Sequence, residues 1–166
     1  MNYARLRAPL DHPSMTEFRL ALDPINAIAK STPGFVWSLD DSCNAAERDA
    51  VPLLRNDALL MPQLSLWKDV PSVQHFAYKS GHAMYLKRKR EWFTAVEPPF
   101  AVCWWFSVDL SSHFGDSSNG HPAVVPTLAE AFEKCQRLKE HGPTDVAFTF
   151  QTARVYPMPP AQNSIH

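Results

Sequence analysis

The stretch that decides the fold is PFAVCWWFSV, residues 99–108. Six consecutive apolar residues, 101–106, lie inside it. Side chains alternate between the two faces of a strand, so Trp104 points to one side and Trp105 to the other. A strand with two apolar faces has to be covered on both sides. We therefore expect helices on one face of its sheet, and a second subunit is a natural candidate for covering the other.

Extended and helical patterns alternate on both sides of this strand. Further strands are predicted over residues 2–8, 34–40, 58–67 and 145–150. Helices are predicted over residues 15–31, 69–93 and 127–141. The polar stretch 41–57 is interpreted as a loop. The order β-α-β-β-α-β-α-β begins with the six elements of the ferredoxin-like arrangement, so the predicted fold class is α+β, with an antiparallel sheet and helices on one face.

Local signals indicate where these helices begin and end. Pro24 interrupts the first helical pattern, so we expect a bent helix whose second segment is capped by Asp23. Gly81 is expected to divide the long helix over 69–93. Thr127 and Glu130 have the spacing of a capping box at the start of the last helix. Four apolar residues are expected to form the buried stripe of that helix: Leu128, Ala131, Cys135 and Leu138.

Length and composition are typical of one globular domain. We assign residues 1–156 to it, with a polar loop insertion at about 111–126 and a loose tail over 157–166. The formal net charge is −1, which gives no reason to expect nucleic acid as a partner. No apolar run approaches the roughly 20 residues that span a bilayer, and the first residues lack the pattern of a secretory signal. We expect a cytoplasmic protein with no membrane partner.

His82 is the first candidate for chemistry. At about 100° per residue, Tyr85, Leu86 and Lys89 fall within about 60° of His82, so the ring is expected to face the sheet. One interpretation is a core histidine whose hydrogen bond comes from Tyr85 or Ser80. The other is a cavity histidine that serves as a general base, with Tyr85 orienting it, or as an axial ligand of haem.

The tryptophans are the second group of candidates. Four of them fall on predicted strands and one at a helix end: Trp37, Trp67, Trp104, Trp105 and Trp92. They form either a tryptophan-rich core or an aromatic-walled pocket that suits a flat apolar ligand. Among the four basic residues 87–90, Lys89 is the one whose aliphatic side chain is expected to lie beside His82. We therefore place it with the tryptophans among the predicted substrate-binding residues.

Other site types find no support in the pattern. The three cysteines, Cys43, Cys103 and Cys135, are far apart, so buried free thiols are expected rather than disulfides or a zinc site. No histidine pair has the spacing for a shared metal, and no metal site is predicted. Phosphate-binding glycine loops and the GxSxG nucleophile motif do not occur.

Five blocks of the chain together resemble one known family. They are ARLRAPLDHP, INAIAKSTPGFVWSL, LSLWKDVPSVQHFAYKSGHAMYLKRKREWF, WW and EHGPTDVAFTF. These blocks are similar to the domain-of-unknown-function family thirty-two ninety-one, which is placed in the dimeric α+β-barrel superfamily beside the antibiotic-biosynthesis monooxygenase-like proteins. The likeness extends over about residues 3–150, and the segment 111–126 is longer than is usual in the family.

The resemblance implies a ferredoxin-like subunit whose sheet packs against the sheet of a second copy. In that superfamily the pocket lies between sheet and helices. Some members bind haem through a helix histidine, and others oxidise polycyclic aromatic compounds without metal or flavin. The family match falls on His82, Arg90, Glu91 and Trp92.

Three functional hypotheses follow. The first is a small homodimeric enzyme of secondary metabolism that oxygenates or cyclises an apolar aromatic or polyketide-like metabolite, with His82 as acid or base and no required cofactor. The second is a module that binds haem or another hydrophobic ligand without turnover. The third is a protein without a ligand, in which His82 is structural.

Overall fold

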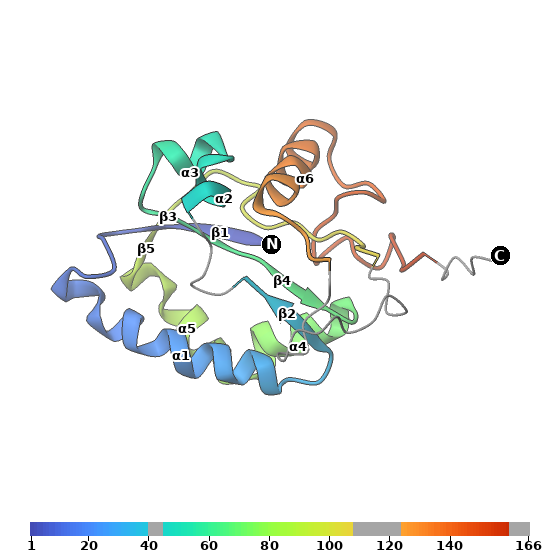
Figure 1. Ribbon diagram of the computed structural model, residues 1–166. Helices are drawn as coiled ribbons and strands as arrows, with labels where there is room; N and C mark the ends of the chain where they lie inside the picture. Colours follow the sequence, from blue (N-terminus) through green and yellow to red (C-terminus); the bar gives the residue numbers. More distant parts are fainter. Residues whose placement is uncertain (40–44, 108–123, 160–166) are drawn as a thin grey trace.

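A computed structural model describes residues 1–39, 45–107 and 124–159 of the chain (Figure 1). The fold is α+β, as predicted, with small antiparallel sheets and helices. One sheet has three strands in the order β3 (Leu60–Gln63), β1 (Asn2–Leu6) and β5 (Phe93–Thr94). The other pairs β2 (Phe35–Ser38) with β4 (Ser65–Trp67). Within the described residues, neither sheet closes into a barrel.

The single strand predicted over 58–67 is divided between the two sheets. Its first part is β3, which pairs with β1, and its second part is β4, which pairs with β2. Leu64 lies between them, is buried, and accepts a 2.8 Å hydrogen bond from the backbone N–H of Leu39. The strands therefore follow one another across the molecule as β5, β1, β3 with its continuation β4, and β2.

The segment 99–107 runs beside β1, but it is not a regular strand. The backbone N–H of Tyr3 donates to the carbonyl of Phe100, and that of Val102 donates to the carbonyl of Met1, both at 2.9 Å. Cys103 and Phe148 exchange two further backbone bonds. The strand predicted over 145–150 contributes only this bridge, because tight turns at Thr144 and Thr149 shorten it on both sides. Both predicted strands were therefore too long.

Helices cover both faces of the central strands (Figure 1). On one face, Leu6 of β1 and Met61 of β3 pack with Phe18 of α1 (Thr16–Ser31). On the other face, Tyr3 of β1 stacks on Phe132 of α6 (Leu128–His141), with 5.3 Å between the ring centroids. The prediction that both faces of the sheet are covered is confirmed. The prediction that helices lie on one face only was wrong, because the chain's own C-terminal helix occupies the second face.

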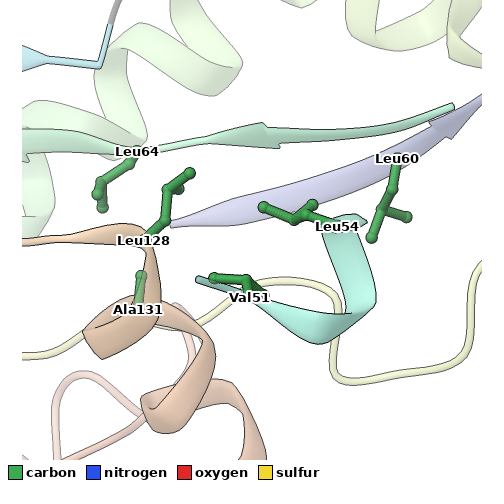
Figure 2. Close-up of a cluster of buried hydrophobic side chains, with 6 residues drawn as sticks. All are labelled: Val51, Leu54, Leu60, Leu64, Leu128 and Ala131. Carbon is green, nitrogen blue, oxygen red and sulfur yellow. The ribbon is translucent and has the colours of Figure 1, made fainter. Parts of the chain in front are cut away.

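Another misprediction concerns residues 41–57, of which 41–44 lie outside the described residues. The rest is not a loop but contains α2 (Ala45–Asp49) and α3 (Pro52–Asn56). Val51 and Leu54, three residues apart, bury their side chains against Leu128 of α6, and Pro52 fits the first turn of α3. Figure 2 shows these side chains meeting Leu60 and Leu64. Tertiary contacts, rather than a long periodic pattern, stabilise these short helices.

The helix limits agree with the sequence signals except at one position. α1 continues through Pro24, so Asp23 does not begin a second segment. Pro24 has no N–H, so the carbonyl of Leu20 receives no helical hydrogen bond from it. Leu20 lies on the exposed side of the helix, where water can reach that carbonyl. The long helix divides at Gly81, as predicted, into α4 (Val70–Lys79) and α5 (His82–Arg88), followed by the short η2 (Lys89–Glu91).

The last helix confirms its predicted limits and buried face. The hydroxyl of Thr127 accepts a hydrogen bond from the backbone N–H of Glu130 at 3.2 Å, and Gly142 ends α6 with φ +71°. The four residues of the predicted stripe are the buried residues of this helix: Leu128, Ala131, Cys135 and Leu138.

Candidate functional site

The break between α4 and α5 is held by the hydroxyl of Ser80. This hydroxyl donates to the carbonyl of Phe76 at 2.6 Å and accepts from the backbone N–H of His82 at 3.1 Å. The backbone of Ser80 is extended, with φ −95° and ψ −177°. One side chain therefore joins the last turn of α4 to the first turn of α5.

Gly81 is favoured here by space rather than by its backbone angles. Its φ of −56° and ψ of −23° are helical and open to any residue. A Cβ atom at this position would lie 2.9 Å from Cδ1 of Ile28 on α1. The glycine thus lets the start of α5 approach α1 closely.

The imidazole of His82 is oriented by a backbone carbonyl. Its Nδ1 lies 3.1 Å from the carbonyl oxygen of Ala77, in the last turn of α4. A carbonyl only accepts, so Nδ1 carries the hydrogen, and this assignment follows from the geometry. In the neutral ring, Nε2 then holds the free lone pair. No hydrogen bond or ion pair reaches Nε2 from any residue that the structure describes.

A stack of aromatic rings leads from the β2–β4 sheet to His82. The imidazole lies on Phe76, with 4.7 Å between centroids, and Phe76 is stacked on Trp67 at 5.3 Å. Phe35 meets the edge of Trp67, whose indole N–H donates to the hydroxyl of Ser65 at 2.9 Å. The stack fixes the plane of the imidazole and brings Trp67 into the same cluster as His82.

Tyr85 and Trp92 belong to a neighbouring cluster. Tyr85 lies tilted against Trp92, 6.3 Å between centroids, and Trp92 is only 3% exposed. Arg88 covers Trp92 from outside, its guanidinium carbon 4.9 Å from the ring centroid. The group that orients the Nδ1 of His82 is the Ala77 carbonyl, so a catalytic role for Tyr85 stays a prediction. Lys89 is exposed in η2.

The remaining tryptophans lie away from His82. Trp37 and Trp104 pack at the edge of the cluster between the sheet and α6. The indole N–H of Trp105 donates to the carbonyl of Tyr156 at 3.0 Å. The indole N–H of Trp104 is buried and has no partner among the described residues. The five predicted tryptophans therefore fall into four places and do not form a single wall.

The structure adds Phe76 and Ala77, which the sequence analysis did not single out. On a straight helix, residues 76 and 77 would not face residue 82, because they lie six and five residues before it, which correspond to about 240° and 140° of rotation. The break at Ser80 changes that geometry. The Ser-Gly pair is the sequence signal for the break, but it does not predict which carbonyl the histidine would reach.

The other reactive groups that the structure describes form no second site. Cys103 and Cys135 are free thiols, as predicted, while Cys43 lies outside the described residues. Burial raises the pKa of both thiols, that of Cys135 to about 11, which disfavours the nucleophilic thiolate. In residues 1–39, 45–107 and 124–159, no three His, Cys, Asp or Glu side chains are grouped to hold a metal ion. In the same residues, no helix is long and apolar enough to cross a membrane.

Comparison with known proteins gives one match. Residues 1–163 match the family described as Domain of unknown function (DUF3291). No curated protein and no solved structure matches the chain.

Proposed function

The chain belongs to the DUF3291 family of domains of unknown function, and from that premise we propose that it is a small enzyme that uses His82 as an acid–base group on an apolar aromatic or polyketide-like metabolite. The observation that carries the proposal is the orientation of the imidazole. Nδ1 donates to the Ala77 carbonyl, so the lone pair at Nε2 is available to take a proton.

The proposed chemistry begins with proton abstraction. Nε2 of His82 takes a proton from an acidic carbon flanked by carbonyl groups, and the substrate becomes an enolate. In a cyclisation, the enolate carbon attacks a carbonyl of the same chain, and the imidazolium returns its proton to the alkoxide that forms. In an oxygenation, the enolate carbon instead forms a bond to dioxygen, which is the oxidant, and the imidazolium returns its proton to the peroxide anion to give a hydroperoxide. Both reactions share the first step, so one histidine serves either.

The aromatic stack supports a flat apolar substrate. Phe76 lies against one face of the imidazole with Trp67 stacked behind it, so the ring of His82 stands at the end of an aromatic, apolar cluster. Of the tryptophans predicted to hold the substrate, Trp67 has the support of this stack. Binding by Trp37, Trp92, Trp104, Trp105 and Lys89 remains a prediction, as do a role in secondary metabolism and a cytoplasmic location.

The test is a screen of the full chain with linear and fused aromatic polyketides that carry a carbon between two carbonyls. Product mass reports cyclisation or oxygenation, and exchange of the acidic hydrogen for deuterium in D₂O reports the first step alone. We compare the wild type with His82→Gln, and with His75→Gln as control, since His75 is an exposed histidine on α4. The proposal requires that exchange falls at least 100-fold in His82→Gln and stays unchanged in His75→Gln, as expected for loss of a general base. Equal exchange by all three proteins would refute it.

Haem binding without turnover is a second candidate, and the same observation favours it. A histidine that binds a metal through one nitrogen usually donates its other N–H to a carbonyl or carboxylate, which orients the ring. His82 has this arrangement with Ala77. A haem titration followed by absorbance tests the idea. A saturable Soret shift near one haem per chain, absent in His82→Ala, would support haem binding, and no shift in the wild type would exclude it.

We also propose that the two sheets are one interrupted ferredoxin-like sheet. All strand pairs are antiparallel, and the order β5, β1, β3–β4, β2 is that of the split βαβ arrangement. The homodimeric barrel is a separate prediction. It requires a partner's sheet on the face of β1 that carries Tyr3, where α6 lies, and this weighs against it. Light scattering after size exclusion at increasing concentration tests it: a dimer would support the prediction, and a monomer throughout would contradict it.

A further inference from the structure

We propose that Ser80 is the positioning residue that sets the tautomer of His82. Its hydroxyl stops α4 so that the Ala77 carbonyl becomes free to hold Nδ1–H. The use of Nε2 as a base rests on the function proposed above. The assignment of Ser80 rests on geometry alone and is tested without a substrate.

At the end of α4, two backbone carbonyls of the last turn accept from side chains. In an uninterrupted helix, the N–H of residue 80 would bond the carbonyl of Phe76, and the N–H of Gly81 would bond the carbonyl of Ala77. In the structure, both carbonyls have side-chain donors instead. The hydroxyl of Ser80 takes the Phe76 carbonyl, and the imidazole of His82 takes the Ala77 carbonyl. The ring of His82 therefore occupies an acceptor that a continuing helix would have used.

Ser80 also caps the start of α5. The Ser80 hydroxyl accepts the N–H of His82, and the Ser80 carbonyl accepts the N–H of Ala83 at 3.0 Å. Together with an extended Ser80 and a helical Gly81, this is the pattern of an N-cap. Ser80 thus places His82 in the first turn of α5, from which its side chain reaches back to α4.

Both bonds of the hydroxyl serve the same geometry. The donated bond ends α4 at Lys79 and exposes the Ala77 carbonyl, and the accepted bond fixes the backbone of His82 beside it. Without the hydroxyl, α4 is free to extend toward Gly81, whose N–H would then compete for the Ala77 carbonyl. The ring of His82 would lose its acceptor, and both neutral tautomers would become populated.

The readout is the pair of ring-nitrogen signals of His82 in the full chain labelled with ¹⁵N. A nitrogen that carries hydrogen and one that bears a lone pair give well separated signals, and fast exchange between tautomers averages them. In the wild type we expect Nδ1 as N–H and Nε2 bare. In Ser80→Ala we expect the ratio of the two tautomers to shift toward Nε2–H by about three- to tenfold, because one hydrogen bond that favours Nδ1–H is lost.

Two further variants separate positioning from general stabilisation. Ser80→Thr keeps the hydroxyl, so the wild-type signals should return. Ser72→Ala removes the serine hydroxyl in the first turn of α4, which donates to Asp69 at 2.7 Å, and should destabilise the protein without moving the His82 signals. If Ser80→Ala does not fold, Ser80→Cys, nearly isosteric and a weaker donor and acceptor, should give a smaller shift in the same direction.

The outcomes distinguish this inference from the proposed function. Wild-type His82 signals in folded Ser80→Ala or Ser80→Cys would overturn the role of Ser80, whatever His82 does. A shifted tautomer in these variants, together with undiminished deuterium exchange by His82→Gln, would support Ser80 as the positioning residue and refute catalysis by His82. A shift in Ser72→Ala as large as in Ser80→Ala would show general loosening and would also overturn the inference.

Discussion

Replacing Gly34 by alanine should destabilise the protein strongly, for two reasons that can be separated. Gly34 has φ +88°, a conformation that costs an L-residue about 1–2 kcal/mol. A Cβ atom there would also overlap the hydroxyl oxygen of Ser72 and lie 2.7 Å from its Cβ. Ser72 cannot move away freely, because its N–H and its hydroxyl both donate to Asp69 at the start of α4.

The magnitude follows from adding the two effects. Overpacking of this kind costs about 1–3 kcal/mol, so the total loss is about 2–5 kcal/mol. With a denaturant slope of about 2 kcal/mol per molar urea, a loss of about 3 kcal/mol lowers the unfolding midpoint by about 1.5 M. Urea unfolding followed by tryptophan fluorescence measures it.

A double-variant cycle tests the reasoning. Ser72→Gly removes the obstructing side chain, so Gly34→Ala should cost about 1–3 kcal/mol less in that background than in the wild type. The explanation is refuted if the two substitutions are additive within about 0.5 kcal/mol.

Two further substitutions test the surroundings of His82. Gly81→Ala should change the free energy of unfolding by less than about 1 kcal/mol, because the better helix propensity of alanine offsets the close contact with the flexible end of Ile28. Ile28→Val removes that end of the side chain, so Gly81→Ala should stabilise the protein in this background. Urea unfolding measures both effects. Arg88→Ala should lower the urea midpoint more at pH 7 than at pH 3. Arg88 holds the pKa of Glu17 and of Glu91 below the usual 4.5, so these pairs contribute stability above that pH and lose it as the pH falls through the lowered values. Equal losses at both pH values would contradict the assigned ion pairs.

The parts of the fold that local chemistry determines could be predicted from the sequence. α6 is the clearest case, because Thr127, the apolar stripe and Gly142 each act within a few residues. The division of the long helix at Gly81 is of the same kind. The two apolar faces of residues 101–106 led to the expectation of a sheet covered twice, and the central strands β1 and β3 are covered in this way although the segment itself is not a regular strand.

Features that depend on distant contacts could not be predicted. The two short helices α2 and α3 exist because Val51 and Leu54 meet α6, which lies about 75 residues further along the chain. Pro62 indicates an edge or a bulge in this strand, but the same extended pattern runs through β3 and β4 and does not predict that they belong to two sheets. A cover for the second face was predictable, but its identity as the chain's own α6 was not.

The candidate site shows the same division. His82 stands out in the sequence, and its helix face was read from periodicity. Its partners Phe76 and Ala77 come within reach only because the chain is extended at Ser80, and the periodicity of a straight helix hides them. Trp67 is brought close by the start of α4, whose first turn is capped by Asp69.

The measurement that tests the central claim most directly is the ring-nitrogen spectrum of His82 in the unmodified full chain. We predict hydrogen on Nδ1, bonded to the Ala77 carbonyl, and a lone pair on Nε2, whose signal shifts when an aromatic polyketide is added. Hydrogen on Nε2 with Nδ1 bare would contradict this prediction, because the nitrogen offered as base or ligand would then carry a proton and no lone pair.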